Sequence, residues 1–427
     1  MLPTRPPSPT RPRTSRTGHE GVLGRLRRKS AREAAARTYA RSLPVVPVRA
    51  RGLTIEGADG RRYLDCLSGG GTLALGHNHP VVLEAIRSVL DSGAPLDVPG
   101  LATPVADAFA GELLRTLPPA LAAHARIRFC APGGTDAMDT ALRLVRTATG
   151  REPVTVLAPG GAECAWAPAP AGIVVEPVQG DGVRAFGDEQ LRRLRHDTAA
   201  RGVLLVADEA RTGLGRTGAF WGVGHSGVVP DVMVLSGAIG GSLPLSVVVH
   251  HDGLDTGAPD GDAPDAFRGN QLAMAAGTAT LRHVRENDLA RRAAGLGTRL
   301  LGRLRELARA YPCLADVRGR GLMIGLEFTA PGEAPADRRR RDAEARESAG
   351  ELATAVRQEC LRRGLIVGPG GPGSAVLRLL PPLTLTDGQA EAVLDRLSDA
   401  VAAVCRPGHR FPVPRTPKEA GAPAPTP

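Results

Sequence analysis

Two short apolar runs, Val203–Ala207 and Val232–Leu235, place the strongest constraint on how this chain folds. Runs of this length and composition are typical of strands that are buried on both faces in a parallel sheet. Each run ends in polar or glycine residues, Asp208-Glu209 after the first and Ser236-Gly237 after the second. Because ligands of open α/β sheets bind beyond the carboxyl ends of the strands, we expect functional residues at these two positions.

The turn Gly133-Gly134-Thr135 is a further candidate for binding, because it opens an amphipathic helical segment within Pro132–Arg151. Backbone N–H groups at a helix N-terminus, the Thr135 hydroxyl and the helix dipole together favour an anion. A plain helix cap accounts for the same residues equally well. The turn alone therefore leaves both interpretations open.

The stretch from Val203 to Leu245 resembles the class III aminotransferases that use pyridoxal 5'-phosphate (PLP), most closely their diaminobutyrate–2-oxoglutarate transaminase branch. The family pattern is Asp-Glu-x-Gln-Thr-Gly-x-Gly-Arg-Thr-Gly, a strand, and then Ser-Lys-x-Ile-Gly-Gly-x-Leu-Pro. This chain reads DEARTGLGRTG and SGAIGGSLP at these places. The segments EPVQGDG at 176–182 and FRGN at 267–270 resemble two further family motifs. The resemblance covers about residues 39–405.

The resemblance implies a fold type I PLP-dependent transferase of the α/β class, with a large domain around a mostly parallel sheet and a smaller α+β domain. The predicted segments are a disordered basic tail (1–38), the N-terminal part of the small domain (39–80), the large domain (81–299, shortened near 151–175), the C-terminal small domain (300–405) and a Pro-rich tail (406–427).

The same resemblance assigns roles to residues of this chain. Gly133, Gly134 and Thr135 would hold the PLP phosphate, and Asp208 would keep the pyridine nitrogen protonated. Arg378 would grip the α-carboxylate of an amino acid or 2-oxo acid substrate, for which a planar guanidinium is suited. Glu176 is a further candidate for substrate binding.

Four features depart from the family pattern. Gly237 stands where the family has the lysine that binds PLP covalently and moves the proton, Arg211 stands at the glutamine, and Ala266 stands at a phosphate-binding threonine. The block that carries an aromatic stacking residue is missing near 151–175, and we do not expect Trp166 to replace it. The chain has only two lysines, Lys29 and Lys418, both in the predicted tails. These changes predict weakened, non-covalent PLP binding and a pseudoenzyme without ordinary transaminase turnover.

Three functional hypotheses follow. The first is a non-catalytic homologue that forms a homodimer or pairs with an active relative. The second is an active PLP- or pyridoxamine-phosphate-dependent transaminase that works without the lysine; His250 and His251 are expected to lie too far along their strand to replace it. The third is a protein that binds nucleic acid or another anion through its Arg-rich tail.

Composition limits these alternatives further. The net charge of +10 arises mostly in residues 1–41, which hold eleven Lys and Arg against two Glu, so nucleic-acid binding is not expected of the folded part. No apolar run is long enough to span a membrane. The six scattered cysteines predict reduced thiols in a cytoplasmic protein, and neither they nor His77 and His79 have the spacing of a metal site.

Overall fold

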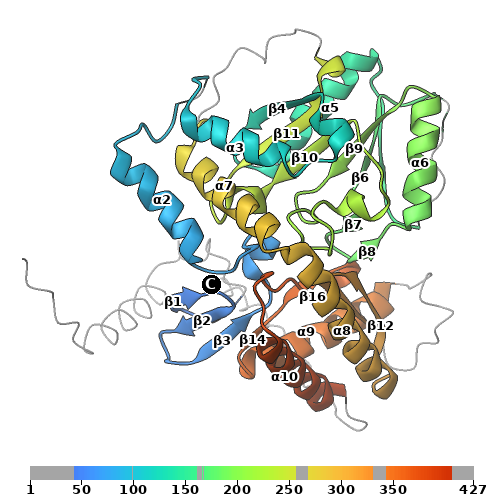
Figure 1. The fold of residues 1–427 in the computed structure, drawn as a ribbon. Helices are drawn as coiled ribbons and strands as arrows, with labels where there is room; N and C mark the ends of the chain where they lie inside the picture. The colour runs from blue at the N-terminus through green and yellow to red at the C-terminus, as the bar shows by residue number, and fades with distance from the viewer. Residues whose placement is uncertain are drawn as a thin grey trace, which may run out of the picture.

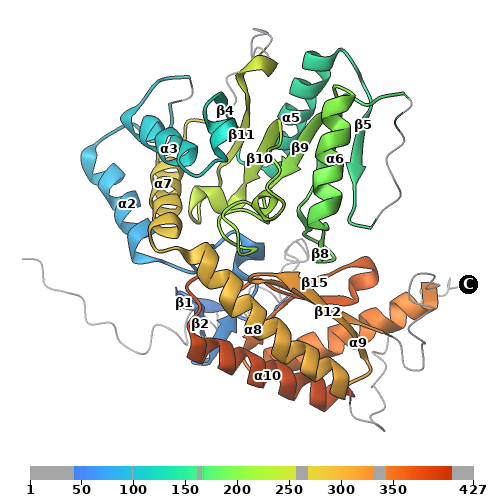
Figure 2. The ribbon, with the colours of Figure 1, turned by 45° about the vertical axis from the view of Figure 1, so that its right-hand side comes forward.

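A computed structural model describes residues 43–98, 100–160, 166, 168–255, 268–329 and 343–405. The predicted tails 1–38 and 406–427, both lysines and Ala266 lie outside the described residues. Two views of the ribbon show the main sheet with its helices above a region of smaller sheets and long C-terminal helices (Figures 1 and 2).

The main sheet has six strands in the order β4-β11-β10-β9-β6-β5. Strands β10, β9, β6 and β5 pair in parallel, whereas β11 runs antiparallel to both β10 and β4. The sheet is thus mostly parallel, and the predicted fold class is confirmed. Its strands are β4 (Ala125–Cys130), β5 (Val154–Leu157), β6 (Gly172–Val175), β9 (Leu204–Asp208), β10 (Val232–Ser236) and β11 (Ser246–His251).

Helices cover both faces of this sheet because alternate side chains of its strands point to opposite sides. On one face, α5 packs against Val174, Val206 and Val234. On the opposite face, Leu205 lies under α6, and Met233 lies under α3 and α7. The flanking helices are α2 (Pro80–Ser92), α3 (Pro104–Leu114), α4 (Pro119–Ala122), α5 (Gly134–Thr149), α6 (Asp188–Ala200) and α7 (Gln271–Glu286).

Two smaller four-stranded sheets, ordered β1-β2-β3-β14 and β12-β13-β16-β15, and one two-stranded ribbon complete the structure. The strands are β1 (Pro47–Arg51), β2 (Thr54–Gly57), β3 (Arg62–Asp65), β7 (Val178–Gln179), β8 (Arg184–Ala185), β12 (Leu314–Arg320), β13 (Met323–Phe328), β14 (Leu365–Ile366), β15 (Gly368–Gly370) and β16 (Val376–Leu379). Their helices are α8 (Leu289–Ala310), α9 (Ala343–Arg362) and α10 (Asp387–Cys405), and short 3-10 turns include η2 (Ser68–Gly71), η4 (Gly237–Gly240) and η5 (Asp252–Leu254).

The cysteines differ from the sequence-based expectation. Cys313, just before β12, and Cys405, at the end of α10, form a disulfide with a Cα–Cα distance of 6.5 Å. The prediction of reduced thiols is therefore wrong for this pair, which strand and helix packing brings together across 92 residues. Cys66, Cys130 and Cys360 are free and buried, as expected of small apolar side chains.

Among the described residues, no helix is both long and apolar enough to cross a lipid bilayer.

Candidate active site

The carboxyl ends of β9 and β10 bring together the residues that the sequence singled out. The two strands pair in parallel, with Val234 opposite Asp208, so β9 ends at Asp208 while β10 continues to Ser236. The N-terminus of α5 lies at the same edge, because a Cβ atom built on Gly134 would be 3.7 Å from the Ser236 hydroxyl oxygen. Asp208, Gly237 and the glycine turn therefore share one end of the sheet.

Asp208 combines partial burial with free acceptor capacity. Its Oδ1 accepts a 3.0 Å hydrogen bond from the amide of Ala210, and no described residue donates to its Oδ2. Burial raises the pKa of this carboxyl, while the Ala210 amide and the charge of Arg211 act in the opposite direction. The side chain can pair with a cationic ring nitrogen.

The start of α5 is an open anion-binding turn. Gly133 is the N-cap residue in an extended conformation, and no side chain caps the helix there. A Cβ at Gly133 would meet nothing within 4 Å, and Thr135 is exposed. The first N–H groups of the 16-residue helix thus face open space, which is the arrangement that binds phosphate groups.

Gly237, the first residue of η4, holds its backbone in the left-handed region at φ +69°. Its amide donates a 3.2 Å hydrogen bond to the carbonyl of Leu245. A Cβ at this position would approach Cγ2 of Thr72, which follows the glycine turn η2, to 3.0 Å. Glycine avoids both the conformational cost and the contact. The described residues include no lysine, so they supply no primary amine at the site.

Two arginines meet over the backbone of Gly180. Arg378 donates from Nη1 to the Gly180 carbonyl at 2.8 Å, and Arg211 lies so close that a Cβ on Gly180 would overlap its guanidinium. Burial lowers the pKa of Arg378, and the charge of Arg211 lowers it further. Its Nε is buried without a hydrogen-bond partner among the described residues. A bound anion would satisfy that donor and offset the repulsion between the two cations.

Glu176 lies beside this arginine pair, at the end of β6. Its Oε2 accepts a 3.1 Å hydrogen bond from the amide of Gly180. Burial raises the pKa of Glu176, and the neighbouring charge of Asp208 adds to that rise. The described contacts give Glu176 a role in shaping the 176–180 turn, and its predicted role in substrate binding stays a prediction.

Two buried residues of the central stretch were given no role by the sequence analysis. Glu209 accepts hydrogen bonds of 2.9 Å from the amides of Gly222 and Val223 and contacts the Thr212 hydroxyl. Arg216 donates to the carbonyls of Pro381, Leu322 and Gly71, and burial lowers its pKa to about 10. Both residues belong to the motif DEARTGLGRTG, which directly follows a buried strand. The four charged residues of this motif were the sequence feature that could have indicated buried polar roles for Glu209 and Arg216.

Trp166 and Ala266 do not contribute to this description of the site. Trp166 packs with the side chains around Ile173 and Leu205, and the Arg201 guanidinium lies 4.5 Å from its ring centroid. It therefore belongs to the α6 face of the sheet. Ala266 lies outside the described residues.

A family model described as aminotransferase class III matches residues 35–158 and 162–401, which include every strand of the site. The chain belongs to the class III aminotransferase family. It is 40% identical to a diaminobutyrate–2-oxoglutarate aminotransferase of Rhizobium meliloti over 440 aligned residues, covering 88% of this chain and 91% of the relative. A protein of the same description from Haemophilus influenzae is 34% identical, covering 88% of this chain and 94% of the relative.

Solved structures of transaminases have the same fold as this chain. An amine transaminase from an uncultivated Pseudomonas species, solved with PLP bound, is 26% identical with a TM-score of 0.74, covering 87% of this chain and 97% of that one. Ornithine δ-aminotransferase of Plasmodium falciparum shares the fold at 23% identity and a TM-score of 0.76, covering 90% and 98%. Class III aminotransferases are PLP-dependent enzymes, as the PLP-bound neighbour illustrates.

The residues present fit PLP in part. The uncapped start of α5 suits its phosphate, and the free Oδ2 of Asp208 suits its ring nitrogen. Gly237 offers no atom for a covalent bond. The described residues thus suit non-covalent binding of the coenzyme.

Proposed function

We propose that this protein is a class III aminotransferase homologue that binds PLP or pyridoxamine phosphate without a covalent bond and does not perform ordinary transamination. One observation carries the proposal: the residue that begins η4, directly after the strand end at Ser236, is Gly237 in a left-handed conformation. None of the described residues is a lysine, so none of them replaces the missing amine.

When bound, PLP supplies the electron sink for reactions at the α-carbon of an amino acid. The chain's own residues do three things in this proposal, and a fourth function, proton transfer at position 237, is missing. The N–H groups and hydroxyl at Gly133-Gly134-Thr135 hold the phosphate, and Asp208 holds a proton on the ring nitrogen. Arg378 orients a carboxylate. Position 237 has no group to move a proton, and general acid–base assistance typically contributes about a hundred- to ten-thousand-fold in rate.

Arg211 supports the same conclusion. Its charge acts on Asp208, Glu176 and Arg378, so it sits among the polar groups of the site. A permanent cation at this place changes the electrostatics around a coenzyme ring that family members surround with a neutral amide. Two departures at one site, Gly237 and Arg211, fit loss of selection for PLP chemistry.

The proposal extends to partners and substrates. We propose a homodimer, or a heterodimer with an active relative. We also propose a cytoplasmic location, in which the Cys313–Cys405 disulfide would be an exception to the usual reduced state of thiols. The relatives named diaminobutyrate–2-oxoglutarate aminotransferase make a diamino acid and 2-oxoglutarate the substrates to test for any residual activity.

The deciding experiment combines a PLP titration with borohydride treatment of the tag-free full-length chain. We expect saturable PLP binding by equilibrium dialysis, no coenzyme left on the polypeptide after borohydride and denaturation, and no amino transfer from 2,4-diaminobutyrate to 2-oxoglutarate. Amino-group exchange that follows the protein through purification would overturn the proposal in favour of a lysine-independent enzyme. Absence of PLP binding would contradict the coenzyme part of the proposal. The remaining hypothesis would then be a non-catalytic homologue that forms a homodimer or pairs with an active relative. Salt-dependent DNA binding that disappears on deletion of residues 1–38 would favour the third hypothesis instead.

A further inference from the structure

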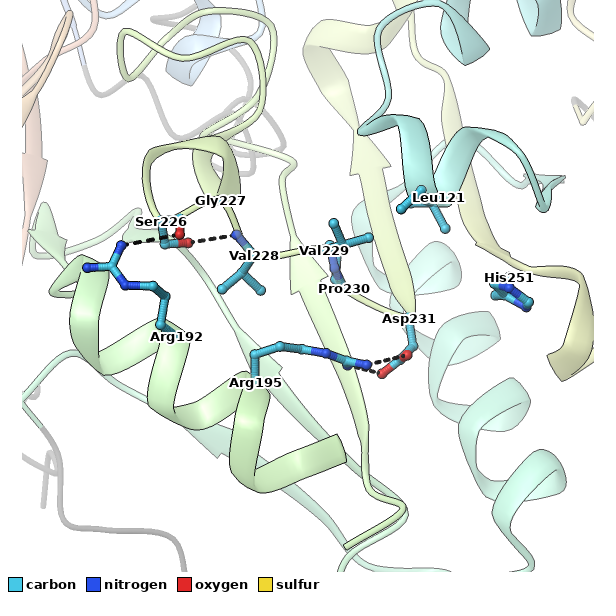
Figure 3. A pocket seen from close by; sticks show the side chains of 11 residues that line it. Leu121, Arg192, Arg195, Ser226, Gly227, Val228, Val229, Pro230, Asp231 and His251 are labelled. Atoms are coloured by element: carbon cyan, nitrogen blue, oxygen red, sulfur yellow. Dashed lines mark hydrogen bonds and ion pairs between the residues drawn. The ribbon is translucent and has the colours of Figure 1, made fainter. Parts of the chain in front are cut away.

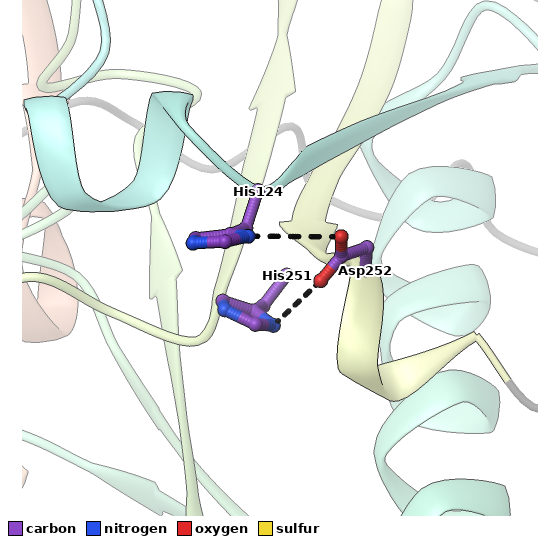
Figure 4. A group of neighbouring side chains, drawn as sticks. All are labelled: His124, His251 and Asp252. Atoms are coloured by element: carbon purple, nitrogen blue, oxygen red, sulfur yellow. Dashed lines mark ion pairs between the residues drawn. The ribbon is translucent and has the colours of Figure 1, made fainter.

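Three potential metal ligands meet at the end of the main sheet opposite to Asp208 and Ser236. His124 precedes β4, His251 ends β11, and Asp252 begins η5. One ligating atom of each lies within 4.8 Å of those of the other two (Figure 4). The antiparallel register places Ser246 beside Ser236 and His250 beside Val232, so this cluster is a strand's length from the candidate active site.

The backbone holds the cluster in place. Strands β4 and β11 are antiparallel neighbours with Ala125 opposite His251, which puts His124 next to the turn that follows β11. The amide of Asp252 donates a 2.7 Å hydrogen bond to the carbonyl of His124. The start of β4 and the turn after β11 are more than a hundred residues apart in the sequence. They are thus held together at the candidate ligands themselves.

The hydrogen bonds leave acceptor atoms facing one another. His251 Nδ1 accepts the amide of Gly253 at 3.0 Å, so this nitrogen carries a lone pair. Asp252 Oδ1, which can only accept as a carboxylate, lies 3.2 Å from the same nitrogen. His124 Nδ1 lies 3.8 Å from Asp252 Oδ2. Two lone-pair atoms in contact repel each other unless they share a proton or a metal ion.

The two imidazole rings are arranged to share such a cation. They stack with centroids 5.0 Å apart and an interplanar angle of 29°. Both rings turn a nitrogen toward the carboxylate of Asp252, as Figure 4 shows. The side chain of His124 is 57% exposed, so an ion can reach the cluster from solvent.

We propose that His124, His251 and Asp252 form a binding site for a divalent transition-metal ion, with Zn²⁺ as the ion to test. Two imidazole nitrogens and one carboxylate oxygen are a ligand set that Zn²⁺ accepts, with water at the open fourth position. The ion takes over the His251 lone pair from the Gly253 amide. The bound metal links the start of β4 to the end of β11.

The neighbouring pocket does not offer an equally strong alternative. It has a volume of about 410 Å³ and is lined by Arg192, Arg195, Asp231 and His251 among others (Figure 3). Arg195 forms two hydrogen bonds with Asp231, and Arg192 donates to the carbonyl of Ser226. Its guanidinium groups are already engaged, so they do not make a site for an anion.

The test is a competition titration of ZnCl₂ between a chromophoric indicator and the tag-free full-length protein. We expect one Zn²⁺ per chain for the unaltered protein. His124→Ala and Asp252→Asn should each weaken binding by more than about tenfold, since even the loss of an outer partner of a metal ligand has that effect. His196→Ala, which removes an exposed histidine of α6, is the matched control and should bind as the unaltered protein does.

A second measurement separates a lost site from a misfolded variant. Added Zn²⁺ should raise the melting temperature of the unaltered protein and of His196→Ala but not of the two cluster variants, whose metal-free melting temperatures should match the unaltered protein. X-ray absorption should show nitrogen and oxygen ligands without sulfur. No stoichiometric binding, binding unchanged in both cluster variants, or sulfur in the first coordination shell would overturn the proposal.

Discussion

At the scale of single residues, position 237 combines the absence of a lysine with a left-handed backbone conformation. The φ of +69° at Gly237 and the 3.0 Å approach of Thr72 Cγ2 to a Cβ at this position act against any side chain there. A left-handed conformation costs a residue with a Cβ roughly 1–2 kcal/mol. This backbone conformation thus suits glycine, and a lysine introduced at position 237 would be strained.

This argument predicts the outcome of Gly237→Lys. We expect the variant to lose about 1–2 kcal/mol of unfolding free energy and to retain PLP on the polypeptide after borohydride treatment. Gly237→Ala is the matched control, because it has the same backbone strain and Cβ contact but no amine. It should lose similar stability and retain no coenzyme. Unchanged stability in both variants would contradict the left-handed backbone, and a Gly237→Lys protein that never retains PLP would show that the pocket no longer admits the coenzyme.

At the scale of elements, Glu209 organises the loop between β9 and β10. It accepts the amides of Gly222 and Val223 and contacts Thr212, so the loop folds around one buried carboxyl group. Burial raises the pKa of Glu209 to about 7. The Thr212 hydroxyl and the two amides all donate to this carboxyl, and their hydrogen bonds oppose the rise in its pKa without cancelling it.

The raised pKa of Glu209 predicts a stability that depends on pH. Between about pH 4.5 and 7 the unfolded chain has released this proton while the folded chain keeps it, so the unfolding free energy falls as pH rises through this window. The full effect is about 3 kcal/mol, from a shift of between two and three pH units. Urea unfolding at a series of pH values should show this decline in the unaltered protein and a shallower one in Glu209→Gln. Glu189→Gln, at an exposed position on α6, should keep the steeper decline. Equal pH profiles for all three proteins would contradict the buried, protonated Glu209.

At the scale of the whole molecule, sequence patterns within single segments predicted the strands and helix that border the candidate site. The buried runs at Val203–Ala207 and Val232–Leu235 are β9 and β10, and the glycine turn at 133–135 begins α5 as expected. Strand β5 was missed because its four residues, one of them exposed and none fully buried, lack a periodic pattern. Sequence could not give the left-handed backbone at Gly237 or the juxtaposition of His124 with Asp252. Both depend on how distant segments pack.

The Cys313–Cys405 disulfide shows the same limit and gives the last prediction. The bond closes a loop of about ninety residues between the start of β12 and the end of α10, and nothing in cysteine spacing revealed it. Constraining so long a loop in the unfolded chain typically stabilises a protein by about 2–4 kcal/mol. We expect reduction, or the double change Cys313→Ser and Cys405→Ser, to lower the unfolding free energy by that amount. Dithiothreitol should have no further effect on the double variant. Alkylation of the unfolded, unreduced protein should leave both cysteines unmodified, and their labelling there would contradict the bond. Because α10 packs on α8 and α9, its anchorage affects the whole C-terminal region, including β16, where Arg378 lies.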